Sequence, residues 1–231
     1  MLFDLRGKGR RNTVRGIYLA LALLMGGGLV LFGVGGSVSG GLLDAFKSNG
    51  GSTSSTFEKR VKAYEKRVQA NPQDAAAWKE LARARYQETS TGDNYDQSTS
   101  SFTPKGIAKL GQVEQAWDRY LALQPKKPDP DVANLMVQAF GPAGLNKLDK
   151  AVAAMEIVVD ERTPPTAALY GQLAQLAYLA GQSRKGDLSS QKAVELAPKD
   201  QKQQLKQTLA SFKTQAAQQA VQNATTTATT P

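Results

Sequence analysis

A run of residues without any charge, from Gly16 to Leu43, constrains the fold more than any other feature of this sequence. Its core reads GIYLALALLMGGGLVLFGVGG. A helix of about 20 apolar residues is long enough to span a hydrocarbon layer about 30 Å thick. A cleaved signal peptide is the alternative, because residues 37–39 resemble a small-residue cleavage site, but the run exceeds the usual apolar region of about 7–15 residues. The sequence therefore predicts a transmembrane helix over residues 16–38.

Lys and Arg residues lie mostly on one side of this segment. Five of them precede it in a basic arm, residues 1–15, whereas Lys47 alone follows it closely. The positive-inside rule then predicts a single-pass protein of the cell membrane, with a cytoplasmic N-terminus and an extracytoplasmic remainder. Small residues at Ala22/Gly26 and Gly36/Gly40 have the spacing that allows self-association of membrane helices, although such helices also tolerate glycine without this role.

The composition excludes several classes of function. The chain has no cysteine and no histidine, which removes thiolate metal sites, cysteine nucleophiles, zinc hydrolases and Ser-His-Asp triads. We therefore expect no enzyme activity, no metal and no cofactor. The net charge of +9 does not predict nucleic-acid binding, because residues 1–15 supply +4 of it and the remaining Lys and Glu are interspersed.

The part after the membrane segment divides into a linker, a helical domain and a tail. Residues 39–56 are predicted as a flexible linker because KSNGGSTSST is rich in Gly and Ser. Ser55 and Glu58 have the spacing of a capping box, and the apolar residues that follow have the period of a helix ending at Asn71-Pro72. The helical domain is predicted over 57–213, and residues 214–231 as the end of a capping helix and a disordered tail.

A repeating pattern fills residues 57–213. The clearest unit runs from Ala167 to Lys199, and its large and small residues have a fixed order: Tyr170, Leu173, Ala174, Ala177, Tyr178 and Gly181, then Ala193, Val194, Leu196 and Pro198. An earlier unit has Trp78, Leu81, Ala82 and Tyr86, with a second helix opening at Thr103-Pro104. A more degenerate unit starts at Asp129-Pro130 and ends at Pro164-Pro165.

These units resemble the tetratricopeptide-repeat (TPR) family, with Gly186 and Ser190 departing from the usual residues of the third unit. The resemblance implies an all-α TPR helical-hairpin superhelix of about three repeats plus flanking helices, preceded by one transmembrane helix. Residues 200–222 would form the polar-backed capping helix that such arrays need. Residues 88–102 interrupt the first repeat and are expected to be a mobile insertion, with Tyr95 and Phe102 able to dock onto the array.

The family binds peptides or partner helices on the concave face, which the first helix of each repeat lines. The corresponding residues of this sequence are Lys79, Arg83 and Gln87, then Ala133, Val137 and Phe140, then Gly171, Gln175 and Tyr178. Such a groove would be cationic at one end and apolar-aromatic at the other, which suits a protein or peptide ligand with an acidic end. The alternative for Phe140 and Tyr178 is that they pack between helices.

The resemblance thus implies a non-catalytic, membrane-anchored TPR scaffold or adaptor that binds protein partners on the extracytoplasmic side. One alternative is a secretion-linked chaperone near the protein-export channel, because an apolar groove would suit emerging chains. Another is an assembly factor, since EKRVQANPQDAAAWKELARARY is similar to TPR proteins of cytochrome c maturation.

Overall fold

The computed structural model describes residues 52–228. The predicted basic arm, the predicted transmembrane helix and residues 39–51 of the predicted linker lie outside the described residues. Within residues 52–228, no helix is both long enough and apolar enough to cross a membrane.

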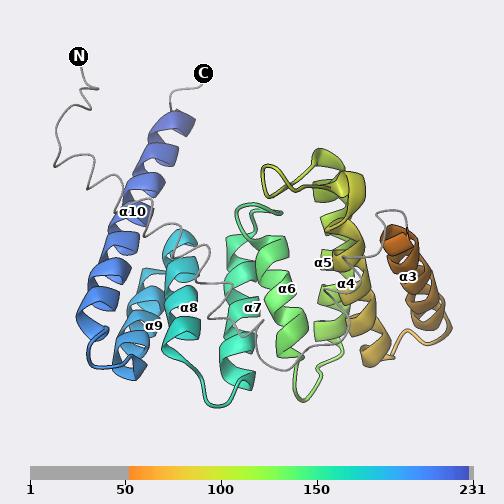
Figure 1. Cartoon of the computed structure of the whole chain (residues 1–231), viewed down its shortest axis with the longest axis horizontal. Coiled ribbons are helices and arrows are strands. Elements are labelled where there is room, and N and C mark those ends of the chain that lie inside the picture. Colours follow the sequence, from red (N-terminus) through yellow and green to blue (C-terminus); the bar gives the residue numbers. More distant parts are fainter. Residues whose placement is uncertain (1–51, 229–231) are drawn as a thin grey trace. The chain divides into compact units, whose positions relative to one another are not determined.

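The described chain is an array of α-helices that pack in sequence order (Figure 1). The helices are α3 (Ser52–Ala70), α4 (Ala75–Thr89), α5 (Pro104–Ala122), α6 (Pro130–Phe140), α7 (Leu148–Glu161), α8 (Ala167–Leu179), α9 (Ser183–Leu196) and α10 (Lys202–Ala228). Three helical hairpins, α4–α5, α6–α7 and α8–α9, form the array, α3 packs on α4, and α10 packs on α8 and α9. The predicted all-α class is confirmed.

Local capping chemistry sets half of the helix starts that the structure describes. Each of four helices begins after a residue whose side-chain oxygen accepts a backbone N–H of the first turn, and these residues are Asp74, Thr103, Asp129 and Thr166. Pro104 and Pro130 follow two of these residues, at the first helical position, where a backbone N–H has no partner within the helix. Proline therefore costs no helical hydrogen bond there. The predicted starts at Thr103-Pro104 and Asp129-Pro130 are confirmed.

The structure corrects two predicted boundaries. Helix α3 begins at Ser52, so the last five residues of the predicted linker are helical. Helix α10 continues to Ala228, into the segment that was predicted to be disordered. Its Gln- and Ala-rich stretch, residues 215–222, explains the extension, because both residue types have high helix propensity and carry the helix past the cap.

The insertion in the first hairpin has a structure of its own. A 3₁₀ turn (Gly92–Asn94) leads into strand β1 (Tyr95–Asp96), which pairs antiparallel with β2 (Ser101–Phe102). The Phe102 ring packs edge-on to Tyr86 and Tyr95, with centroids 6.3 and 5.2 Å away. Phe102 therefore docks the insertion onto the core, as the docking hypothesis expected, and the structure shows a short hairpin where a mobile loop was expected.

Two apolar clusters hold the array together. The larger one runs from α3 to α8, and its largest fully buried side chains include Phe140, Leu81, Leu110, Met136 and Met155. The smaller one joins α8, α9 and α10 through Ala174, Tyr178, Ala193, Leu209 and Ala216. Leu173 and Ala174, two residues of the third unit's pattern, are buried, at 5% and 0% exposure.

Candidate functional site

Asp129 is the centre of a polar junction between the first two hairpins. It precedes α6, and its Oδ1 accepts the N–H groups of Asp131 and Val132 at 3.0 and 3.1 Å. Its Oδ2 lies 3.0 Å from Lys79 Nζ and 3.3 Å from Arg83 Nη2, both on α4. One carboxylate thus caps α6 and ties it to α4.

The same residue also binds the first hairpin through its backbone. The N–H of Asp129 donates to the Tyr120 hydroxyl of α5 at 3.0 Å. Burial by itself would raise the pKa of Asp129, but the Val132 N–H and Lys79 outweigh it and hold that pKa below its usual value. Burial would likewise lower the pKa of Lys79, yet its contact with Asp129 raises it above the usual value. The pair is therefore ionised at neutral pH.

These contacts correct the prediction of a cationic groove end. Lys79 and Arg83 also lie 3.4 and 3.5 Å from Glu80, so that two cations face two carboxylates. Their side chains are only 26% and 28% exposed. The charges of the junction balance, because Asp129 adds a second carboxylate to Glu80. Asp129 lies 46 residues from Arg83 along the chain, outside α4.

Two further polar contacts lie at the C-terminal half of α4. The Tyr86 hydroxyl donates to Gln138 Oε1 of α6 at 3.0 Å, and burial raises the pKa of Tyr86 to about 12. Gln87, predicted as a groove residue, is half-buried and accepts a hydrogen bond from Arg60 Nη1 of α3 at 3.3 Å. The amide of Gln87 is thereby fixed in orientation while part of it stays accessible.

The predicted aromatic wall is buried instead. Phe140 is fully buried and Tyr178 is 6% exposed, so neither lines an open groove, and the alternative of packing between helices is the correct one. Phe140 follows Met136 by one helical turn and shares its buried face, as Tyr178 does with Ala174. Ala133 is also fully buried, whereas Val137 remains half-buried at the edge of the core.

On α8, two of the predicted groove residues remain accessible. A Cβ atom added to Gly171 would meet no heavy atom within 4 Å, so the space in front of this glycine is open. Gln175 is half-buried and lies one turn further along the same face. Helix α8 therefore presents a low patch of backbone next to an amide side chain.

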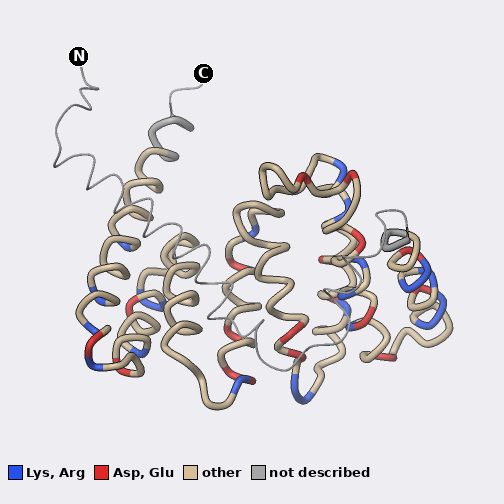
Figure 2. Tube along the Cα trace, in the orientation of Figure 1, with Lys and Arg blue, Asp and Glu red and all other residues tan. Residues whose placement is uncertain are grey.

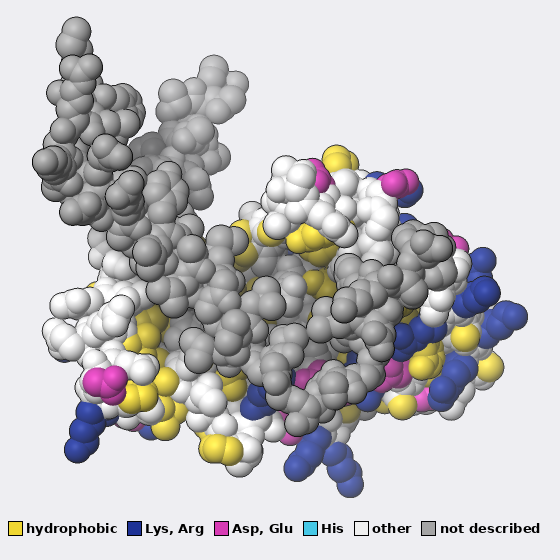
Figure 3. Space-filling view, viewed as in Figure 1, with side chains coloured by type: hydrophobic (Ala, Val, Ile, Leu, Met, Phe, Trp, Pro, Cys, Tyr) yellow, Lys and Arg dark blue, Asp and Glu magenta, His cyan; other side chains and the backbone are white. Residues whose placement is uncertain are grey.

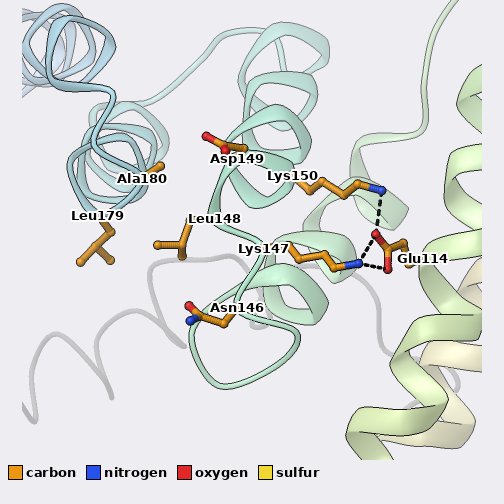
Figure 4. A pocket seen from close by; sticks show the side chains of 8 residues that line it. All are labelled: Glu114, Asn146, Lys147, Leu148, Asp149, Lys150, Leu179 and Ala180. Carbon is orange, nitrogen blue, oxygen red and sulfur yellow. Dashed lines mark hydrogen bonds and ion pairs between the residues drawn. The ribbon is translucent and has the colours of Figure 1, made fainter. Parts of the chain in front are cut away.

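A separate cleft, which the sequence did not predict, lies between α5, the start of α7 and the end of α8 (Figure 4). Its volume is about 540 Å³. Lys147 and Lys150 bind Glu114 at 2.6 and 2.8 Å on one side, and Leu148 and Leu179 lie on the other. Burial would raise the pKa of Glu114, but the two lysines hold it below its usual value. Lys150 also lies 2.6 Å from Asp118 of α5, so two lysines face two carboxylates and hold α5 to α7.

The residues that the structure describes contain no group of three metal-ligating side chains. In the insertion, Asp96 Oδ1 accepts hydrogen bonds from the N–H and hydroxyl of Ser98 at 2.8 and 2.6 Å, and so serves the turn between β1 and β2. Asp93 lies 3.8 Å from Lys105. Both carboxylates have local structural contacts.

The third hairpin shows how its fixed order of large and small residues packs. Gly181, in the turn between α8 and α9, has a φ of 72°, a conformation that glycine adopts readily. Gly186 on α9 lies directly against the Tyr178 ring, because an added Cβ would be 2.4 Å from Tyr178 Cδ1. A large residue on one helix thus meets the smallest residue on its partner.

Neither a protein-family model nor a curated protein matches this sequence.

Proposed function

We propose that this chain is a membrane-anchored scaffold with TPR-like repeats, which binds a protein partner along the first helices of its hairpins on the extracytoplasmic side. The hairpin array supports the repeat interpretation, and the uncharged run at 16–43 with its flanking charges supports the anchor and its orientation. The bound surface would be formed by accessible side chains of α4, α6 and α8: Lys79, Arg83, Gln87, Val137 and Gln175.

The observation that carries this proposal is the open patch at Gly171 beside Gln175. A glycine inside a helix destabilises it by roughly 0.5–1 kcal/mol relative to alanine. No neighbouring atom within the domain requires a glycine at position 171, since an added Cβ would meet open space. A partner backbone lying against α8 would require glycine there, because only glycine permits such a close approach.

The balanced junction at Asp129 changes the kind of ligand that we expect. An acidic tail would have to displace Asp129 or Glu80 from Lys79 and Arg83, exchanging one ion pair for another with little net gain. The amide of Gln87, which Arg60 holds in place, and the half-buried amide of Gln175 suit hydrogen bonding to an extended peptide instead. We therefore propose a polar peptide segment as the bound element.

The chaperone alternative loses its structural basis at the aromatic wall. It depended on an apolar groove, and Phe140 and Tyr178 are inside the core. An assembly factor with one defined partner remains a special case of the scaffold, and identification of the partner would distinguish it.

Photocrosslinking from the open patch tests the binding site. A photoreactive residue is placed at Gln175 of the full chain in intact cells, and at the exposed Gln191 on α9 as the control. We expect one discrete protein adduct from position 175 and none from 191. A ladder of many adducts would favour a chaperone, and equal adducts from both positions would place binding elsewhere.

The anchor and its orientation have their own test. The chain should stay with membranes during alkaline extraction, and a reporter fused to its C-terminus should be active only on the extracytoplasmic side. A reporter active in the cytoplasm would overturn the orientation.

A further inference from the structure

Helix α3 separates its charged residues into distinct faces. Phe57, Val61 and Val68 are buried against the array, and Lys59, Lys62 and Lys66 lie on the opposite, exposed face. Figure 2 shows the concentration of basic residues along α3, and Figure 3 shows Lys and Arg side chains projecting from this end of the domain. The three lysines are spaced by three and four residues, so they form one continuous stripe.

Of the other ionised residues of α3, Glu58 is exposed and forms no ion pair with any residue that the structure describes, and the rest are engaged within the domain. Arg67 lies 3.0 Å from Asp74, Glu65 lies 2.9 Å from Arg85, and Arg60 donates to Gln87. By contrast, Lys59, Lys62 and Lys66 form no ion pair with any residue that the structure describes. Lys62 and Lys66 lie one turn apart and repel one another, and Glu58, four residues before Lys62, offsets only part of this repulsion. An external anion facing the stripe would therefore stabilise it.

The position of α3 in the chain identifies that anion. Thirteen residues, 39–51, separate the predicted membrane segment from α3, and a chain of this length reaches at most about 45 Å when fully extended. A tether of this length allows the stripe to reach the surface of the membrane that the predicted segment spans. Anionic lipid headgroups attract lysines close to the bilayer surface, and this attraction decays within about one Debye length of the surface.

We propose that the stripe of Lys59, Lys62 and Lys66 docks α3 on an anionic bilayer surface. This inference rests on the membrane anchor of the proposed function. Docking would place the buried face of α3, and with it the first hairpin, on the side away from the lipid. The array would then be presented to its partner in a fixed orientation.

A single fluorescent label tests this proposal in the full chain. The protein has no cysteine, so Ala63→Cys, on the exposed side of α3, gives one labelling site. The labelled chain is reconstituted in vesicles of phosphatidylcholine alone or with added phosphatidylglycerol, both containing spin-labelled headgroups as quenchers. We expect strong quenching only with phosphatidylglycerol, and its loss at high salt.

Matched charge variants give the expected size of the effect. K59Q/K62Q/K66Q should lower the ratio of docked to undocked protein on the order of a hundredfold, given the attraction of each lysine to an anionic surface. K126Q/K127Q/K199Q removes the same charge from exposed positions elsewhere and should leave quenching unchanged. Circular dichroism checks that both variants fold.

Two results would overturn the proposal: equal quenching in both kinds of vesicle, or quenching that the α3 variant does not alter. A short DNA duplex whose affinity falls in the α3 variant, while lipid quenching stays the same, would reassign the stripe to nucleic acid. Flotation separates this proposal from the anchor. A chain that floats with pure phosphatidylcholine but shows no quenching with phosphatidylglycerol retains the anchor and loses the docking face. A chain that floats only with phosphatidylglycerol loses the anchor and retains the docking face.

Discussion

The two ends of the helical array are held together in different ways. Between α4 and α7, large side chains such as Phe140, Leu110 and Met136 fill the space between helices and are fully buried. Around α8, α9 and α10, the buried residues are mostly alanines, with Tyr178 and Leu209 as the large ones. The first region is stabilised by the volume it buries, and the second by close approach of helices across small residues.

The polar contacts of the two regions also differ, because those of the first region are more buried than those of the second. Asp129 is 21% exposed and receives hydrogen bonds from α6 and ion pairs from α4. At the other end, Asp187 binds Lys213 of α10 at 2.7 Å, but both side chains are about half exposed. Because exposed ion pairs contribute little to stability, α10 should be held mainly by its apolar contacts, whereas Asp129 contributes to the contact between hairpins.

The largest expected effect is the loss of volume in the first region. Phe140→Ala should lower the free energy of unfolding by about 3–5 kcal/mol, because it leaves a cavity where a fully buried ring was. Denaturant unfolding followed by circular dichroism measures this. Leu188→Ala is the control, since Leu188 is 58% exposed and its truncation should change stability by less than about 0.5 kcal/mol. Equal effects would mean that Phe140 is not part of the core.

The second region should be sensitive to added volume instead. Ala174→Leu should destabilise the protein by about 1–3 kcal/mol, because Ala174 is fully buried where α8 meets α9 and α10. Gly186→Ala tests the same packing from α9, as its new Cβ would overlap the hydrogen-bonded Tyr178 ring. Thermal melting of both variants is the measurement. Unchanged melting of Ala174→Leu would show that the repeat register of the third hairpin is wrong.

Two substitutions at Asp129 separate its cap from its charge. Asp129→Asn keeps an oxygen for the α6 N–H groups and loses the ion pairs, for a cost below about 1 kcal/mol. Asp129→Ala loses the cap as well, for roughly 1 kcal/mol more. Chemical denaturation of the two variants beside the wild type gives the difference. An equal cost for both would mean that the cap contributes nothing.

The ion pairs of Asp129 also predict a pH dependence. The pKa of Asp129 is lowered in the folded state, so its contribution is complete above the usual aspartate value of about 3.9 and is lost as the pH falls through the folded pKa. Wild-type stability should therefore fall on acidification below about pH 4, and this fall should be smaller in Asp129→Asn. Parallel stability curves for the two proteins would contradict the assignment.

Local chemistry explains which parts of this structure the sequence predicted. The starts of α5 and α6 were predictable because a capping side chain and the proline after it act within one turn. The groove was not, because Lys79 and Arg83 find their partner, Asp129, on another hairpin. Phe140 was assigned to the groove although its spacing from Met136 places it on the same buried face.

The smallest predicted effect distinguishes the open patch at Gly171 on α8 from the packed contact between Gly186 on α9 and Tyr178 on α8. Gly171→Ala should raise the free energy of unfolding by about 0.5–1 kcal/mol, because the added Cβ meets no atom and alanine favours the helix. The same substitution at Gly186 should act in the opposite direction, since Tyr178 fills that space. Denaturant unfolding measures both signs, and crosslinking from Gln175 measures whether the stabilised Gly171→Ala protein has lost its partner. A variant that is more stable but binds less would assign Gly171 to recognition, whereas full binding would show that the open patch is not where the partner backbone lies.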